Sequence, residues 1–89
     1  MTTVYLDGSF TDDAEARVLA GDGLLSGRGL FETFRARRGH VLALDSHLDR
    51  LRRGAQVLGM PLPRQAADLP AIVRELVDRL GLSDARVRL

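Results

Sequence analysis

The sequence contains no cysteine, no tryptophan and no lysine. Without cysteine, disulfide bonds and zinc–thiolate sites are excluded. Without lysine, none of the 89 residues has an amine side chain for covalent catalysis, because all 13 basic residues are arginine, which stays protonated. No apolar run approaches the roughly 20 residues of a membrane span, and the N-terminus has no secretory signal pattern. These absences predict a cytoplasmic protein with no membrane partner.

Charge and aromatic content argue against nucleic-acid binding. The formal net charge is +1, with 13 basic and 12 acidic residues, whereas a dedicated nucleic-acid binder carries a basic excess. Arginines cluster at 35–38 and 50–53, but three Phe and one Tyr are too few to interleave as stacking platforms. We therefore expect solvated faces and no nucleic-acid partner. His40 and His47 lack companion ligands, so no metal site is predicted.

The first part of the chain predicts a hairpin followed by irregular structure. Residues 3–10, TVYLDGSF, alternate apolar and polar side chains around Asp7-Gly8, a pair that supplies the positive φ angles of a two-residue turn. Residues 11–23 are polar and contain glycine, so we expect mostly loop. The glycine-rich stretch 22–29, DGLLSGRG, is expected to let the backbone come close to a ligand or another segment.

Residues 30–44 predict two strands joined by a turn at Arg38-Gly39. Successive side chains of a strand point to opposite faces. One face then carries Phe31, Thr33, Arg35 and Arg37, and the other carries Leu30, Glu32, Phe34 and Ala36. Neither face is purely apolar, so we expect both to be partly covered.

Two helices and a last strand complete the predicted elements. The first helix is expected to be capped by Asp45 or Ser46 and to end in the segment GMPLP, residues 59–63. Its apolar stripe consists of Leu48, Leu51, Ala55 and Leu58. The second helix has Pro70 near its first turn and ends at Gly81. The final residues, DARVRL, read as a strand.

The predicted order β-β-β-β-α-α-β indicates an α+β domain, with two helices packed on a mostly antiparallel sheet. Arg50 is its most distinctive candidate side chain, since we expect it in the first turn of a helix, where free N–H groups attract anions and a guanidinium can bind two phosphate oxygens. The alternative is a surface arginine paired with Asp49, or with Asp45 or Ser46 at the cap. His47 shares the helical face, and we expect a packed or capping residue rather than a catalyst, because nothing in the sequence places it near a nucleophile.

Residues 22–60 resemble the N-terminal domain of the class IV pyridoxal-phosphate enzymes. That family includes branched-chain aminotransferases, D-amino acid aminotransferases and aminodeoxychorismate lyases. The residues in register with its motif are Gly29-Leu30-Phe31-Glu32-Thr33, Gly39, His47, Arg50, Leu51 and Leu58-Gly59. The flanking segments also fit, so the resemblance covers nearly the whole chain. Two positions depart from the family pattern: Gly23 follows Asp22 where Arg is frequent, and Arg28 precedes Gly29 where Asp is frequent.

The resemblance implies roles for individual residues. Arg50 would bind the phosphate of pyridoxal phosphate, with His47 packing or hydrogen bonding beside it. Phe31, Thr33 and Arg35 would border the substrate, Phe31 as an apolar wall and Arg35 toward a substrate carboxylate or the pocket entrance. Glu32 would point the other way and serve the structure. No catalytic residue is expected within the chain.

The resemblance also implies what lies outside the chain. Residues 1–89 would be the small N-terminal domain of a homodimeric aminotransferase or aminodeoxychorismate lyase acting on an amino acid or on aminodeoxychorismate. The Schiff-base lysine and the acidic residue facing the pyridine nitrogen would belong to a second domain, so this chain, truncated or the only ordered part of a longer product, would be inactive alone. Phe31-Glu32-Thr33 favours the lyase or D-amino acid branch. The alternative is a small non-enzymatic α+β domain that docks on a partner.

Overall fold

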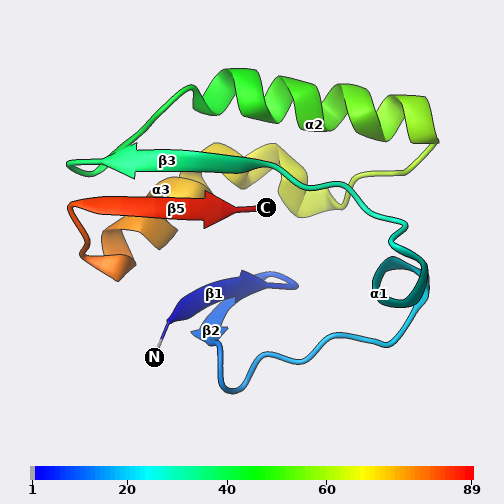
Figure 1. Cartoon of the computed structure of the whole chain (residues 1–89), viewed down its shortest axis with the longest axis horizontal. Coiled ribbons are helices and arrows are strands. Elements are labelled where there is room, and N and C mark those ends of the chain that lie inside the picture. Colours follow the sequence, from blue (N-terminus) through cyan, green and yellow to red (C-terminus); the bar gives the residue numbers. More distant parts are fainter. Residues whose placement is uncertain (1) are drawn as a thin grey trace.

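A three-stranded antiparallel sheet forms the centre of the structure, a computed structural model that describes residues 2–89 apart from the side chain of Asp22. Its strands are β3 (Thr33–Arg37), β4 (His40–Val41) and β5 (Asp84–Arg88), in the order β4-β3-β5. Figure 1 shows β3 and β5 side by side. Backbone pairing continues past β3 and β5, because Glu32 and Leu89 exchange hydrogen bonds of 3.2 and 2.9 Å. The predicted strands and their turn are therefore confirmed.

The N-terminal hairpin forms a separate two-stranded sheet of β1 (Thr3–Leu6) and β2 (Ser9–Asp12). Its turn has Asp7 at φ 50° and Gly8 at φ 93°, as an Asp-Gly hairpin requires. The rings of the paired residues Tyr5 and Phe10 meet edge to face, with centroids 5.0 Å apart. The Arg79 guanidinium lies 4.2 Å from the centroid of the Phe10 ring and so ties the hairpin to the second long helix.

The two long helices are α2 (Leu44–Leu58) and α3 (Leu69–Leu80), and the 3₁₀ helix η1 (Arg64–Asp68) leads into α3. In Figure 1 the two helices lie on the far side and along the top of the central sheet, and β1 lies beside α3, which it contacts. Gly59 and Gly81 end the helices in the left-handed conformation, with φ angles of 66° and 63°. Both predicted stops are confirmed, and so is the α+β class.

The predicted cap of α2 is wrong. The helix begins at Leu44, its N-cap residue is Ala43 with φ 54°, and no side chain caps it. Leu44 is buried in the core, so packing draws the helix start to a position before both Asp45 and Ser46. Arg50 consequently lies in the second turn of α2 rather than the first.

The expectation of mostly loop at 11–23 is confirmed for residues 13–21, and the structure differs at the two ends of that range. Strand β2 extends to Asp12, and a short helix, α1 (Asp22–Ser26), occupies the glycine-rich stretch. The N–H groups of Leu24 and Leu25 donate to the Gly21 carbonyl and close its single turn. Both leucines are exposed, so no apolar periodicity toward a core marks this helix in the sequence. The predicted element order therefore lacks α1 and η1.

The core lies between the central sheet and the two long helices. Its buried members are Phe34, Ala36, Leu44, Leu48, Val73, Val77 and Val87. Of the predicted α2 stripe, Leu48 and Ala55 are buried and Leu51 is half-buried, but Leu58 is 59% exposed. The 15-residue helix is about 22 Å long and the 5-residue strand β3 about 17 Å. In Figure 1 the later part of α2, including its last turn, extends beyond β3.

Candidate functional site

Glu32 is a carboxylate on the core-facing side of the sheet. Buried and exposed residues alternate along β3, and Glu32 continues the buried set of Phe34 and Ala36 at the strand's start. It is only 4% exposed. A carboxylate in such a position is costly unless it is paired and hydrogen bonded. Its partners therefore define the local structure.

Those partners are His47 and Arg50, which lie three residues apart on one face of α2. Arg50 donates from Nε to Oε1 and from Nη2 to Oε2 of Glu32, both at 2.7 Å. His47 Nδ1 lies 2.7 Å from Oε2 of the same carboxylate. The His47 ring also packs against Phe34, with ring centroids 5.3 Å apart. The sheet and the helix are thus joined by a bidentate ion pair between Glu32 and Arg50 and by the contact of His47 with the same carboxylate.

The alternative partners expected for Arg50 are wrong. Asp49 pairs with Arg52 instead, at 3.5 Å, and no hydrogen bond joins Arg50 to Asp45 or Ser46 within the described chain. The expected structural role of Glu32 and the supporting role of His47 are what the geometry shows. The signal that could have found the pair is that Glu32 is the only charged residue on an otherwise apolar strand face, since a buried acid demands a cation from the element packed over it.

The electrostatics of this cluster keep Glu32 ionised. Hydrogen bonds from Arg50, and after them from His47, lower the pKa of Glu32 to about 2, although burial acts in the opposite direction. Glu32 in turn raises the pKa of Arg50 above its usual value. The carboxylate–guanidinium pair is therefore intact across the neutral range, and the guanidinium plane has a fixed orientation.

Arg50 retains the capacity to bind an anion. Two of its five N–H groups are used by Glu32, which leaves three on the Nη edge. The side chain is 66% exposed, so these donors reach solvent. Because Arg50 lies in the second turn of α2, the free N–H groups at the helix start would contribute little to an anion bound here, and the guanidinium would supply the hydrogen bonds. A phosphate group fits this edge; a covalent link to a coenzyme does not, since the chain has no lysine.

Phe31, Thr33 and Arg35 lie on the opposite face of β3 from Glu32, as the alternation predicts. All three are exposed, Phe31 by 64%. The structure therefore brings these three predicted residues together on one face, and separates them from Arg50 by the strand. The expectation that this face is partly covered is wrong for the described chain, where its four members are all exposed.

Two arginines of β5 share that face and were missed from the sequence. Arg88 pairs with Thr33 across the ladder, and Arg86 pairs with Arg35. The Arg88 guanidinium lies 4.4 Å from the centroid of the Phe31 ring. The signal was present in the alternation of the final RVR segment, which places both arginines on one side of the strand.

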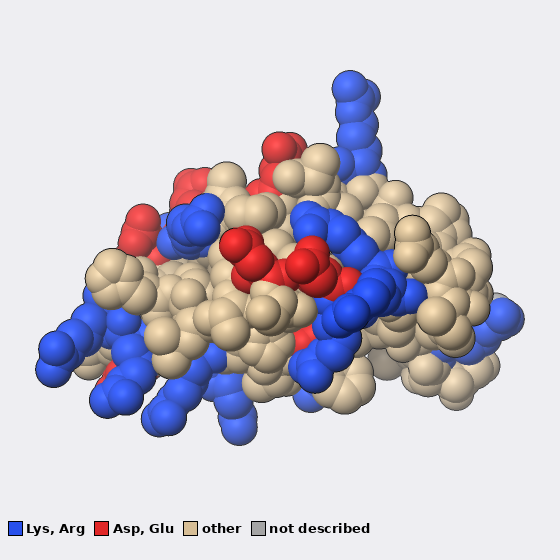
Figure 2. Space-filling model, turned by 90° about the horizontal axis from the view of Figure 1, so that it is seen from above, with Lys and Arg blue, Asp and Glu red and all other residues tan. Residues whose placement is uncertain are grey.

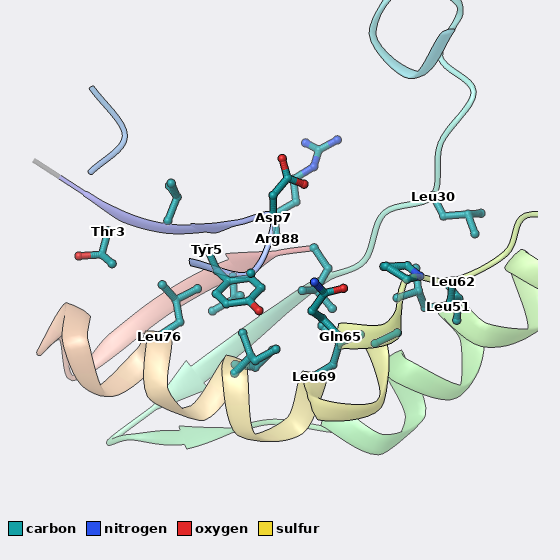
Figure 3. Close-up of a pocket in the computed structure, with 18 of the residues that line it drawn as sticks. Thr3, Tyr5, Asp7, Leu30, Leu51, Leu62, Gln65, Leu69, Leu76 and Arg88 are labelled. Carbon is teal, nitrogen blue, oxygen red and sulfur yellow. The ribbon is translucent and has the colours of Figure 1, made fainter. Parts of the chain in front are cut away.

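A hollow with a mainly apolar lining lies elsewhere in the structure. A cavity of about 680 Å³ separates the hairpin from α3 and the free edge of β5, and in Figure 3 Tyr5, Leu69 and Leu76 surround it. Leu30 and Leu51 reach its far end, but Phe31, Thr33, Arg35 and Arg50 do not line it. The cavity is therefore distinct from the predicted site residues.

Within 2–89, no group of three or more His, Asp or Glu side chains is arranged to hold a metal ion. None of the helices in the described part of the chain is both long enough and apolar enough to cross a membrane.

The model of the Amino-transferase class IV family matches residues 29–89, which is well over half of the chain and includes Glu32, His47 and Arg50. The chain belongs to the class IV aminotransferase family. The family assignment confirms the resemblance that rests on the GLFET and H-x-x-R-L motifs.

Relatives within the class IV family point to aminotransferases. The chain is 39% identical over 87 residues to a protein of Methanocaldococcus jannaschii named as a branched-chain-amino-acid aminotransferase, covering 97% of this chain and 30% of that one. It is 32% identical over 78 residues to a D-alanine aminotransferase of Staphylococcus epidermidis, covering 86% of this chain and 28% of the relative.

Solved structures of the family have the same fold. A branched-chain aminotransferase from Thermoproteus uzoniensis, solved with norvaline, superimposes with a TM-score of 0.86 at 34% identity, over 98% of this chain and 31% of that one. The fold IV transaminase CpuTA1 from Curtobacterium pusillum gives a TM-score of 0.73 at 27% identity, over 90% of this chain and 29% of that one. The chain therefore spans about 30% of the length of these relatives and corresponds to their N-terminal part.

Proposed function

We propose that this chain is the N-terminal domain, residues 1–89, of a pyridoxal-phosphate-dependent class IV aminotransferase, and that Arg50 binds the coenzyme's phosphate. The observation that carries the proposal is the Glu32–Arg50 pair. Glu32 fixes one edge of the guanidinium by two hydrogen bonds of 2.7 Å, and the other edge remains exposed for a phosphate. Membership of the family supports pyridoxal phosphate as the anion's source.

The other site residues of this chain bind and orient the substrate. Bound pyridoxal phosphate supplies the electron sink for chemistry at the α-carbon of an amino acid. Phe31 offers an exposed apolar ring as one wall of a substrate site, and Thr33 and Arg35 offer a hydroxyl and a guanidinium on the same face. Arg35 suits a substrate carboxylate because its planar fork can donate two parallel hydrogen bonds.

The amine that holds the coenzyme and the base that moves the proton at the α-carbon come from a second, lysine-bearing domain. None of the residues 1–89 is a lysine. Relatives are about three times as long, since the chain covers 30% and 28% of the first two. Because the amine and the base both lie outside residues 1–89, this chain is inactive alone.

The finer assignment is to a cytoplasmic homodimer of the D-amino acid aminotransferase or aminodeoxychorismate lyase branch. Thr33 follows Phe31-Glu32 at the position where branched-chain enzymes tend to have glycine, and this supports that branch. Exposed Leu24 and Leu25 support association, because large exposed apolar side chains favour a protein partner. The substrate is then an amino acid or aminodeoxychorismate.

The test is the substitution Arg50→Ala in the full-length enzyme. We expect it to weaken pyridoxal phosphate retention roughly ten- to hundredfold, as loss of hydrogen bonds to a charged group does. Retention is measured by titrating the apoenzyme with the coenzyme and following the coenzyme's absorbance. Arg53→Ala is the matched control, because Arg53 is an exposed arginine on the same helix and should leave retention unchanged. Equal retention by the Arg50 variant and the wild type would refute the assignment of Arg50.

A further inference from the structure

His47 makes the third hydrogen bond to the buried carboxylate of Glu32. Arg50 donates the other two, from Nε to Oε1 and from Nη2 to Oε2, and His47 Nδ1 lies 2.7 Å from the same Oε2. Because the pKa of Glu32 is lowered to about 2, the carboxylate is ionised at neutral pH and can only accept hydrogen bonds. Nδ1 of His47 therefore carries a hydrogen and donates, which fixes the neutral imidazole in its Nδ1–H tautomer.

The two bonds between Glu32 and Arg50 orient these groups relative to each other, but they do not orient the pair relative to the rest of the protein. The last torsion of a glutamate side chain, which turns the plane of the carboxylate, has no sharply preferred value. Arg50 cannot set that plane, because its own side chain is long and 66% exposed. A donor that is itself held by the protein core is needed to fix the carboxylate plane.

His47 is a donor of this kind. Its side chain is 22% exposed, and its ring packs against Phe34 with the centroids 5.3 Å apart and the planes inclined by 37°. Phe34 is 4% exposed and belongs to the buried core. The backbone N–H of His47 also donates to the Ala43 carbonyl in the first turn of α2. The Nδ1–H group therefore has a fixed direction, which reaches Arg50 through Oε2 of Glu32.

The charges of the surrounding surface cannot replace this orientation. Figure 2 looks down on the side where α2 lies in Figure 1, and basic and acidic side chains are intermixed on that surface. On α2 itself, Asp49 pairs with Arg52 at 3.5 Å. An anion at Arg50 therefore meets a surface of mixed charge, so the position of the anion depends on the direction in which one guanidinium presents its donors.

We propose that His47 is a positioning residue for the coenzyme's phosphate: its Nδ1–H group fixes the carboxylate plane of Glu32, and the carboxylate fixes the plane in which Arg50 presents its three remaining N–H groups. The proposal rests on the proposed function, because it takes Arg50 to be the phosphate ligand. Without the Nδ1–H donor, Arg50 keeps its charge but presents its free edge over a wider range of directions. Phosphate binding then has to order the guanidinium, and this ordering costs affinity.

The experiment separates the donor of His47 from its ring in the full-length enzyme. His47→Phe keeps a ring beside Phe34 and removes the donor, whereas His47→Asn removes the ring and places an amide N–H where Nδ1 lies. We expect pyridoxal phosphate retention to fall about three- to tenfold in His47→Phe and to stay within about twofold of the wild type in His47→Asn. His47→Gln is a second variant without the donor, because its amide nitrogen corresponds to Nε2, and it should lose retention as His47→Phe does.

A spectroscopic readout on the apoenzyme is independent of the coenzyme. The NMR signal of the Arg50 Nε–H group, assigned by its absence from Arg50→Ala, should exchange slowly with solvent in the wild type and in His47→Asn. It should exchange faster in His47→Phe and His47→Gln, because the carboxylate that accepts this bond is then less fixed. His40→Phe is the control, since His40 is exposed on β4 and takes no part in the cluster, and it should change neither the signal nor retention.

The outcomes separate this inference from the proposed function. Retention that falls in His47→Asn but not in His47→Phe would overturn the positioning role, because the ring and not the donor would then matter. Unchanged retention in both His47→Phe and His47→Gln would also overturn it, provided that Arg50→Ala loses the coenzyme. Wild-type retention in Arg50→Ala would instead overturn the assignment of Arg50 in the proposed function.

Discussion

At the residue scale, Glu32 links the sheet to the proposed coenzyme ligand. It is buried, and its two oxygens accept from Arg50 and meet His47, all at 2.7 Å. Replacing both members of a buried ion pair by apolar groups can leave the stability unchanged. Removing only one member leaves either a buried carboxylate without a partner or a guanidinium whose orientation is no longer fixed. The orientation of Arg50 therefore depends on the charge of Glu32 as much as on the helix that carries Arg50.

The ionisation of Glu32 predicts how the free energy of unfolding depends on pH. The pKa of Glu32 is lowered to about 2 from 4.5, so its contribution to stability is complete above pH 4.5 and is lost as the pH falls toward 2. Glu32→Gln should lower the free energy of unfolding at neutral pH and should make its decline between pH 4.5 and 2 shallower than in the wild type. Urea unfolding followed by circular dichroism across this range measures both effects.

Glu75→Gln is the control for the pH series, because Glu75 forms an exposed i,i+4 pair with Arg79 and such pairs contribute little. Its acid profile should follow the wild type. An unaltered slope in the Glu32 variant would show that the carboxylate is not the group whose protonation weakens the fold.

At the element scale, α2 has two parts with different roles. Its first turns lie over the sheet and bury Leu44 and Leu48, whereas its last turn passes beyond β3 and leaves Leu58 exposed (Figure 1). His47 and Arg50 lie in the part that faces the sheet, near buried Leu44 and Leu48 in the sequence. This part of the helix places Arg50 beside Glu32, whereas the exposed Leu58 lies at the other end.

Two substitutions on the same apolar stripe test this division. Leu48→Ala should reduce the free energy of unfolding by about 2–5 kcal/mol, because Leu48 is 1% exposed and a cavity would remain. Leu58→Ala should change it by less than about 0.5 kcal/mol, because the side chain is already in solvent. Both effects are measured from the midpoints of urea unfolding curves, provided that the dependence of the unfolding free energy on urea concentration is the same in each variant. Similar losses in the two variants would contradict the overhang.

Local chemistry made much of the fold predictable. The Asp7-Gly8 turn, the glycine stops of both helices and the alternation along β3 each follow from one or two residues. The start of α2 was not predictable in this way, because burial of Leu44 overrides the capping preference of Asp45 and Ser46. Helix α1 gave no signal, since it buries no apolar face.

The site was predictable only in part, for a related reason. The motif identified Arg50 and His47, and strand alternation placed Phe31, Thr33 and Arg35 on one face. The partner of Arg50 depends on how α2 packs over the start of β3, and this contact joins residues far apart in the sequence. The pairing of Arg86 with Arg35 depends likewise on the register of β5. The alternation of residues along a strand predicts which face a side chain lies on, but the residue beside it on the next strand is known only from the pairing of the strands in the sheet.

At the scale of the whole molecule, several large apolar side chains lie exposed on the surface. Val18, Leu19, Leu24 and Leu25 are all at least 63% exposed and lie within one short stretch of sequence. Exposed apolar groups of this kind mark interaction sites in soluble proteins. The remainder of a longer enzyme, or a second copy of the chain, would cover them.

The isolated 89-residue chain should therefore self-associate as its concentration rises. Sedimentation velocity over a range of concentrations should show an increasing mean mass, and Leu19→Glu with Leu25→Glu should reduce it, because a charge is costly to bury in an apolar contact. Leu82→Glu is the control, since Leu82 is 55% exposed and lies outside this stretch. A chain that stays monomeric at every concentration would argue that the exposed leucines are not an association surface.

The two backbone hydrogen bonds between Glu32 and Leu89 have a mechanical consequence. They fix the main chain of Glu32 to the end of β5, so the position of the carboxylate that orients Arg50 depends on the last described residue. A displacement of this end of β5 would therefore shift Glu32 and, through its side chain, the guanidinium of Arg50, which we propose as the phosphate ligand.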